Sequence, residues 1–239
     1  MKTIPTLGEI LQSQGVSRRG FMKYCAATAS LLALPPAMIP RIARALEQAR
    51  RPSVIWLSFQ ECTGCTESLT RSSSPTLEGL IFDSISLDYH HTLQAASGDA
   101  AEAARHAAMQ ENMGNYLVLV DGSIQMGNPG FSTIAGISNY DMLMETVEGA
   151  AAVVAIGSCA AFGGIPGADP NPTGAVSVSD LVKDKPIVNV PGCPPIPMVI
   201  TAVLTQFLTF GQLPDLDIHG RPTAFFGQTI HDRCYRRPF

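Results

Sequence analysis

Three apolar segments of this chain each run into a cysteine-containing loop, and this arrangement limits the possible folds more than any other feature. The three pairs are residues 54–59 with Cys62 and Cys65, residues 151–156 with Cys159, and residues 186–190 with Cys193. Short apolar runs of this kind are typical of buried strands. In an open α/β sheet, ligand sites collect beyond the carboxyl ends of the strands. The sequence therefore predicts that three strand ends bring four thiols to one place.

The rest of the chain supplies alternating strands and helices around these segments. Strands are expected at residues 53–59, 84–89, 116–120, 151–156, 187–190 and 223–226, and helices at 65–72, 95–113, 141–149 and 198–210. Asp141 is expected near the N-cap of the third of these helices, and residues 124–138 and 163–174 are rich in Gly and Pro and are expected to form loops. Strands that alternate with helices indicate an α/β protein with a doubly wound, mainly parallel sheet.

The composition and the distribution of charge indicate which kinds of molecule this protein binds. The chain has 239 residues, of which 46% are hydrophobic and 15% charged, so it is long enough and apolar enough to fold around one good core. Residues 1–45 carry six Lys and Arg against one Glu, whereas the remainder carries ten Lys and Arg against 19 Asp and Glu. An acidic body with no basic tract argues against nucleic-acid binding. The expected partners are proteins and small redox molecules.

The N-terminal segment has the order of an export signal. Residues 17–23 contain the pair Arg18-Arg19, an apolar run fills residues 24–39, and Ala-Arg-Ala stands at 43–45. That run has about 16 residues, fewer than the roughly 20 needed to span a bilayer. The segment resembles a twin-arginine signal, which exports proteins already folded, although an ordinary amphipathic helix is the alternative. Cleavage is expected after Ala45 and would remove Cys25, to which the sequence assigns no role.

Spacing alone leaves several kinds of cysteine site open. The thiols suit an iron–sulfur cluster or zinc, and a thioredoxin-like dithiol or two disulfides are further alternatives. Gly64, Gly157 and Gly192 lie next to the cysteines in the sequence and would let the backbone approach a bulky inorganic core. This feature favours the iron–sulfur cluster.

Longer motifs around these cysteines match a known family. They are residues 61–68 (ECTGCTES), 87–90 (LDYH), 157–164 (GSCAAFGG), 171–175 (NPTGA), 191–195 (PGCPP) and 221–223 (RPT). Together and in this order they resemble the small subunit of periplasmic uptake nickel–iron hydrogenases. The similarity extends from the signal segment to the last residue.

The resemblance implies a fold and a set of ligands. Residues 1–45 would be the signal, 46–215 a flavodoxin-like domain, and 216–239 the start of an incomplete C-terminal iron–sulfur domain in a truncated chain. Cys62, Cys65, Cys159 and Cys193 match the ligands of the family's proximal 4Fe-4S cluster. His231 and Cys234 match two of the four ligands of its distal 4Fe-4S cluster. The other distal ligands and a medial 3Fe-4S cluster would be present only in a longer chain.

The resemblance also implies a function. The chain would transfer electrons from dihydrogen oxidation, at the nickel–iron centre of a separate large subunit, to a cytochrome or quinone acceptor, and would contain no catalytic residue itself. It would work in the periplasm, in contact with the membrane only peripherally or through an anchor outside this sequence. The alternatives are a hydrogen-sensing subunit, an iron–sulfur subunit related to the quinone reductase of complex I, and a structural zinc module.

Overall fold

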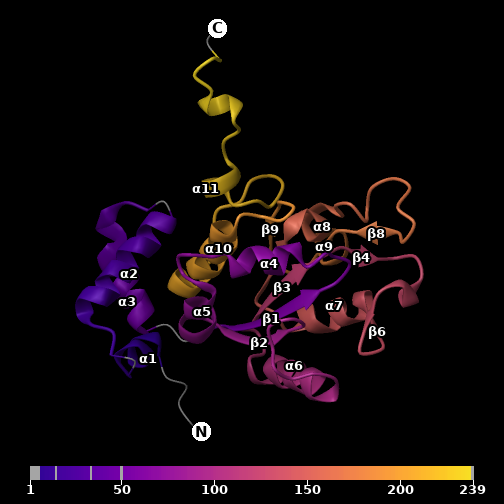
Figure 1. Cartoon of the computed structure of the whole chain (residues 1–239), viewed down its shortest axis with the longest axis horizontal. Coiled ribbons are helices and arrows are strands. Elements are labelled where there is room, and N and C mark those ends of the chain that lie inside the picture. The colour runs from indigo at the N-terminus through magenta and orange to yellow at the C-terminus, as the bar shows by residue number, and fades with distance from the viewer. Residues whose placement is uncertain (1–5, 14, 33, 49–50, 238–239) are drawn as a thin grey trace.

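A five-stranded parallel sheet forms the centre of the molecule (Figure 1). The computed structural model describes residues 6–13, 15–32, 34–48 and 51–237. The strands are β1 (Ser53–Ser58), β2 (Ser86–His90), β3 (Leu117–Asp121), β7 (Ala152–Ile156) and β9 (Ile187–Val190). Their order in the sheet is β2-β1-β3-β7-β9, and each neighbouring pair is parallel. This order is that of flavodoxin-like proteins, so the predicted doubly wound α/β fold is confirmed.

Helices and short elements connect these strands. The helices of the body are α4 (Gly64–Thr70), α5 (Leu77–Gly79), α6 (Asp99–Glu111), α7 (Asn139–Glu148), α8 (Gly157–Phe162), α9 (Val178–Leu181), α10 (Pro197–Phe210) and α11 (Thr223–Phe226). Single turns are η2 (Leu80–Ser84), η3 (Pro129–Phe131) and η4 (His231–Arg233). Two small antiparallel pairs join β4 (Ile124–Gln125) to β8 (Ala175–Val176) and β5 (Thr133–Ile134) to β6 (Ile137–Ser138).

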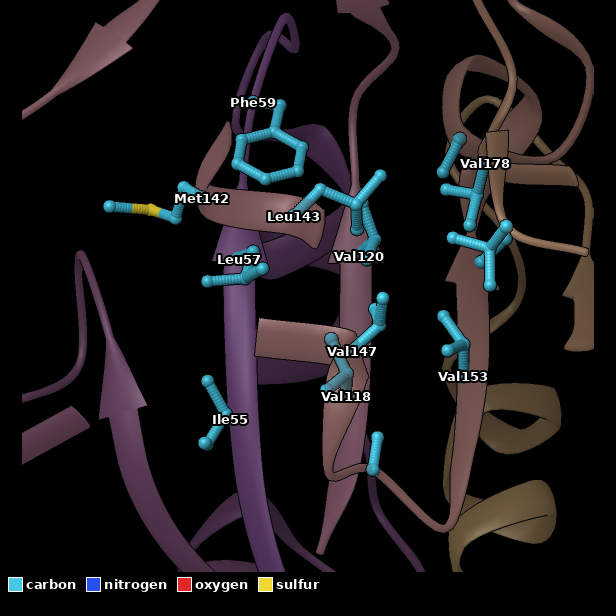
Figure 2. Packing of buried hydrophobic residues seen from close by; sticks show 14 of the residues in the cluster. Ile55, Leu57, Phe59, Val118, Val120, Met142, Leu143, Val147, Val153 and Val178 are labelled. Atoms are coloured by element: carbon cyan, nitrogen blue, oxygen red, sulfur yellow. The ribbon is translucent and has the colours of Figure 1, made fainter. Parts of the chain in front are cut away.

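Both faces of the sheet are buried, because alternate side chains of each strand point to opposite sides. On one face Leu57 and Val120 pack with apolar side chains of α7 and α9, including Leu143 and Val178 (Figure 2). On the other face Trp56 and its neighbours pack against apolar side chains of α4 and α10. The two layers explain why these strands are almost continuously apolar in the sequence.

Most sequence-based boundaries agree with the structure to within a few residues, and the differences have local causes. The helix expected from residue 95 begins at Asp99, because Gly98 has a positive φ of 57° that no helix contains. The N-cap of α7 is Ser138 instead of Asp141, since its hydroxyl accepts a hydrogen bond from the Asp141 amide at 3.1 Å. The loop predicted at 124–138 contains β4 and the pair of β5 with β6, and β8 and α9 directly follow the loop predicted at 163–174.

The strand predicted at residues 223–226 is wrong. These residues form the single helical turn α11, in which the amides of Phe225 and Phe226 donate to the carbonyl of Pro222. The adjacent sheet edge is already occupied, because the Asn189 amide of β9 donates to the carbonyl of Gly220 at 2.7 Å. A run of apolar residues this short cannot by itself distinguish a strand from a helical turn.

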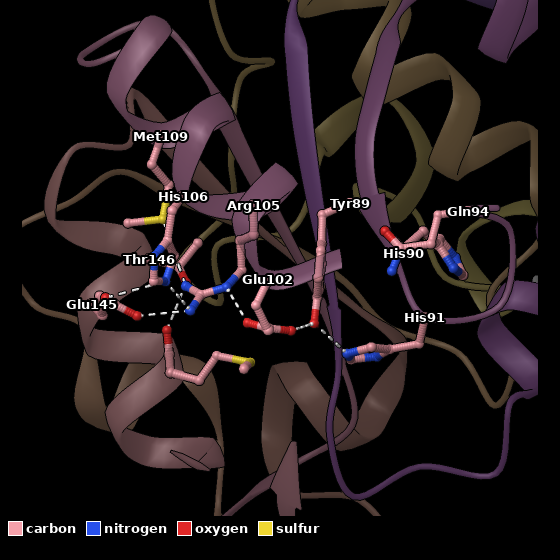
Figure 3. Close-up of polar contacts among 11 residues, drawn as sticks. Tyr89, His90, His91, Gln94, Glu102, Arg105, His106, Met109, Glu145 and Thr146 are labelled. Carbon is pink, nitrogen blue, oxygen red and sulfur yellow. Dashed lines mark hydrogen bonds and ion pairs between the residues drawn. The ribbon is translucent and has the colours of Figure 1, made fainter. Parts of the chain in front are cut away.

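A buried arginine connects three elements on the α6 face. The Arg105 side chain has no exposed surface, and it donates to Glu102 at 3.0 Å, to Glu145 of α7 at 2.9 Å and to the Thr146 hydroxyl at 2.9 Å (Figure 3). Glu102 in turn accepts a 2.6 Å hydrogen bond from Tyr89 of β2. This network holds α6 against both the sheet and α7.

The N-terminal residues pack on the body. Helices α1 (Leu7–Ser13), α2 (Arg18–Leu31) and α3 (Ile39–Gln48), with the turn η1 (Pro36–Met38), form a group beside α5 and α10 (Figure 1). Residues 1–5, 14 and 33 of the predicted signal lie outside the described residues. At the other end, the segment after α11 projects away from the sheet (Figure 1). No helix among the described residues is long and apolar enough to cross a membrane.

Replacing Arg105 tests the buried network. We expect Arg105→Ala to lower the free energy of unfolding by roughly 3 kcal/mol, because it leaves the partly buried Glu102 carboxylate without its cation. Arg71→Ala is the matched control: Arg71 pairs with Glu67 at the surface, and its loss should cost less than about 1 kcal/mol. Urea denaturation of the two variants measures the difference, and equal losses would contradict the structural role of Arg105.

Candidate functional site

Four cysteines line one cavity at the carboxyl edge of the sheet. Cys62 lies in the loop after β1, Cys65 is in the first turn of α4, Cys159 is in α8 directly after β7, and Cys193 follows β9. The cavity has a volume of about 70 Å³ and is lined by all four of them. Glu61, Gly64, Gly122, Ser158, Gly192 and Pro194 complete its wall. The structure thus brings together the four thiols that the sequence predicted to converge.

Hydrogen bonds between the loops fix their relative positions. The Ser158 amide donates to the Gly192 carbonyl at 2.8 Å, and the Gly192 amide donates to the Ser158 hydroxyl at 3.2 Å. These bonds join the loop of Cys159 to the loop of Cys193. The buried Ser68 hydroxyl of α4 donates to the Pro195 carbonyl at 2.6 Å and ties the Cys65 helix to the same loop. Three segments that are distant in sequence therefore form one rim.

Glycines leave space beside the sulfur atoms. Gly157 has a φ of +85°, and a Cβ placed on it would lie 2.5 Å from the Cys65 Sγ. Gly164 has a φ of +57°, and its Cβ would lie 2.6 Å from the Cys159 Sγ. Both positions need a residue without a side chain, for backbone conformation and for space. The backbone can therefore approach closely around the thiols.

A buried carboxyl group lies near the cysteines. Asp121, at the end of β3, is completely buried, with the Ser58, Trp56 and Thr66 side chains beside its carboxyl group. Burial raises the pKa of Asp121 to about 7, although hydrogen bonds from Ser58, Trp56 and Thr66 oppose the shift, the last of them at 3.4 Å. The motifs in the sequence assigned no role to Asp121. An acidic residue that closes a buried apolar strand was the signal that could have revealed it.

Two of the four thiols at the cavity, those of Cys65 and Cys159, have raised pKa values. Burial raises the pKa of Cys65, and the negative charge of Asp121 raises it further. Burial also raises the pKa of Cys159. Both thiols therefore remain protonated at neutral pH without a metal. A metal that binds them must displace protons, so its affinity depends on pH.

His90 lies next to α4, the helix that carries Cys65, and contacts Thr66 of that helix. It is fully buried, its Nε2 lies 3.3 Å from the Thr66 hydroxyl, and its Nδ1 accepts from the Thr92 and Leu93 amides. Burial lowers the pKa of His90 to about 4, so the ring is neutral. Because both ring nitrogens have partners within the protein, His90 stabilises the fold next to α4.

His231 and Cys234 lie apart from the four-cysteine cavity. His231 is in η4 and exposed, and Cys234 follows it, half-buried, in the projecting C-terminal segment. All six cysteines are free thiols. Among the described residues, no three His, Cys, Asp or Glu side chains are arranged to hold a single metal ion. A single zinc ion would need four sulfurs at about 2.3 Å from one point.

Comparison with known proteins assigns the family. A family model described as NADH ubiquinone oxidoreductase, 20 Kd subunit, matches residues 62–207. Over all its residues the chain is 47% identical to the uptake hydrogenase small subunit of Azotobacter vinelandii, of which the match covers 67%. The reduced, active form of the Ni-Fe-Se hydrogenase from Desulfomicrobium baculatum contains a chain of the same fold, with a TM-score of 0.73 and 33% identity over 78% of this chain and 74% of that one.

The chain belongs to the family of nickel–iron hydrogenase small subunits. It is also 44% identical to the hydrogenase-2 small chain of Escherichia coli strain K12, over 96% of this chain and 62% of that protein. The chain spans about two thirds of the length of the hydrogenase small subunits that it matches. The resemblance inferred from the motifs is confirmed. Agreement along the whole chain favours the hydrogenase family over the complex I subunit, whose family model matches only residues 62–207.

Replacing Gly157 tests the close approach of the backbone to Cys65. Gly157→Ala should lower the free energy of unfolding by about 3 kcal/mol, from backbone strain of roughly 1–2 kcal/mol plus overlap with the Cys65 sulfur. Gly136→Ala is the control, since Gly136 has a φ of +79° and nothing within 4 Å of its Cβ position. Gly136→Ala should lower the free energy of unfolding only by the backbone strain of roughly 1–2 kcal/mol. Equal losses in urea denaturation of the two metal-free chains would show that the sulfur does not restrict position 157.

The raised pKa of Asp121 predicts a pH dependence of stability. The carboxyl group titrates near 3.8 in the unfolded chain and near 7 in the folded one, so between these values the folded chain binds the extra proton. The contribution of Asp121 to the free energy of unfolding therefore falls as pH rises from about 4 to 7. Asp121→Asn should gain stability relative to the parent chain over this range, and a pH-independent difference would contradict the assignment. Comparing the two chains cancels the opposite effect of His90, whose pKa is lowered.

Proposed function

We propose that this chain is the electron-transfer subunit of a nickel–iron hydrogenase. It carries electrons from dihydrogen oxidation, at the nickel–iron centre of a large subunit, to a cytochrome or quinone acceptor. The observation that carries this proposal is the convergence of Cys62, Cys65, Cys159 and Cys193 on one cavity of about 70 Å³. Family membership supports it, because the A. vinelandii relative is named as an uptake hydrogenase small subunit.

The proposed occupant of the cavity is a 4Fe-4S cluster. Four thiols line the cavity, and glycines leave space beside two of the sulfurs, which supports an occupant with more than one metal atom. Such a cluster, when bound, supplies a one-electron carrier. The protein's part is to hold four deprotonated sulfurs in place, which the bonds between Ser158 and Gly192 and between Ser68 and Pro195 accomplish. Asp121 adds a buried acidic group beneath the site.

The large subunit is the proposed partner at the cavity rim. Apolar side chains next to the cysteine loops are exposed: Phe162 and Ile165 follow Cys159, and Ile196 and Met198 follow Cys193. Exposed apolar groups gathered beside a functional site are typical of a protein interface. A partner over this rim would bury them and exclude water from the cluster.

His231 and Cys234 are proposed to serve a second site. They lie three residues apart on the projecting segment, and they would provide part of a distal 4Fe-4S site in a longer chain, together with a medial 3Fe-4S cluster. This exposed segment is also where an electron acceptor would approach.

The periplasm is the proposed location of the protein. Arg18 and Arg19 stand at the start of α2 and are exposed, as a receptor for a twin-arginine signal requires. The twin-arginine route accepts folded proteins, which suits a chain that must receive its cluster before export. An association with the inner membrane would come through the acceptor or an anchor outside this sequence.

Loss of single cysteines tests the cluster assignment. After anaerobic reconstitution, the parent chain should contain about four iron atoms and four acid-labile sulfides. Cys62→Ser and Cys159→Ser should each lose most of both, because a ligand at the cavity is missing. Cys25→Ser is the matched control and should retain the cluster, since Cys25 lies among the N-terminal helices. Zinc without acid-labile sulfide in the parent chain would refute the cluster.

Loss of electron transfer tests the function itself. In the complex with the large subunit, Cys62→Ser should abolish hydrogen-dependent reduction of an electron-accepting dye that takes its electrons from the small subunit. Retention of that activity would contradict the proposed role.

A further inference from the structure

Helix α10 has buried residues on more than one side, and three of them are threonines. Val199, Ile200, Val203 and Leu204 pack against the sheet. Leu208, on another side of the helix, packs among apolar residues of α2 and α3. Its apolar side chains therefore belong to two separate clusters. The sheet covers one side of α10, so something else must cover the other.

In this structure the N-terminal helices provide that cover. Both α2 and α3 lie beside α10 and contact it (Figure 1). Helix α1 contacts η2. Cys25 of α2 and Ile42 and Leu46 of α3 have no exposed surface and belong to one cluster with Leu208. The Tyr24 hydroxyl lies 3.3 Å from the Ser84 hydroxyl of η2. The predicted signal is therefore docked on the body by a small apolar core of its own.

The arginine pair and the predicted cleavage site of the signal differ in their exposure to solvent. Arg18 and Arg19 follow the N-cap Ser17 and are exposed to solvent. The predicted cleavage bond, between Ala45 and Leu46, lies inside α3, and Leu46 is completely buried. Proteolysis concentrates at exposed, poorly ordered segments, and a bond inside a packed helix is not one of them.

We propose that the outer face of α10 is the docking surface for the chain's own signal segment, and that docking withholds the Ala45–Leu46 bond from cleavage while the arginine pair stays available for recognition. The inference rests on the proposed export route. Cleavage then requires that α3 first leaves α10, so recognition precedes processing.

The interface contains a feature that favours release. Thr205 of α10 faces Tyr24, Ala27, Thr28 and Leu31 of the signal across a small cavity. Its hydroxyl is buried without a hydrogen-bond partner in the structure. When the signal leaves, water can hydrogen-bond to this hydroxyl. The free energy gained in this way offsets part of the free energy that docking gains from burying apolar surface. This cost weakens the docking of the signal segment on α10.

Cys25 reports docking directly. Burial raises the pKa of the Cys25 thiol to about 11, and only the thiolate reacts with iodoacetamide. In the purified full chain, peptide mass spectrometry should show alkylation of Cys25 roughly a hundredfold slower than in the same chain unfolded in urea. Equal rates in the folded and unfolded chains would overturn the proposal.

Substitution on the body tests the link to cleavage without altering the signal. Leu208→Glu places a charge in the docking cluster and should raise both the Cys25 alkylation rate and the rate of cleavage by a purified signal peptidase by roughly tenfold or more. Gln206→Glu is the matched control, because it adds the same charge to a half-buried position of α10 and should change neither rate. Ile42→Glu repeats the test from the signal side, where the substituted residue does not pack against the sheet.

The outcomes separate the inference from the export route. Faster alkylation of Cys25 in Leu208→Glu and Ile42→Glu without faster cleavage would refute the masking of the bond. Failure of the peptidase to cut even the unfolded chain would refute the export signal itself, while the alkylation rates would still decide whether the segment docks.

Discussion

Burial of a parallel sheet on both faces is the constraint on which this structure depends. Parallel strands need crossover helices, and the helices cover both faces, so β1, β7 and β9 must be apolar along almost their whole length. Polar chemistry can then appear only where the strands end. All of the parallel strands point the same way, and their carboxyl ends share one edge. The four-cysteine cavity at that edge is a direct consequence of this geometry.

The four cysteines are held close together mainly by the backbone of the loops around the cavity. Gly157 and Gly164 lie against the sulfurs of Cys65 and Cys159, and Ser158 and Gly192 exchange hydrogen bonds between two of the loops. The cysteines are therefore held by segments that are themselves fixed. The compact arrangement also buries the Asp121 carboxyl group completely, and this burial raises its pKa.

Local patterns predicted the long elements well and the short ones badly. The five strands of the sheet and helices α6, α7 and α10 follow from apolar runs and helical stretches that leave little ambiguity. Residues 223–226 fold as a turn of helix because the neighbouring sheet edge is already occupied by Gly220, which local sequence does not reveal. The packing of α2 and α3 on α10 was equally hidden, since apolar periodicity identifies a face but not its partner.

By itself the sequence determined the fold class, the family and the convergence of four cysteines, because strand periodicity and the motifs around each cysteine are local properties of the chain. Only the tertiary structure decided what surrounds those cysteines. It placed Asp121 and His90 beneath the site, put His231 and Cys234 on a separate projecting segment, and buried Cys25 and Leu46 against α10. These are contacts between residues far apart in the chain, and burial, pKa and access to solvent exist only once such contacts have formed.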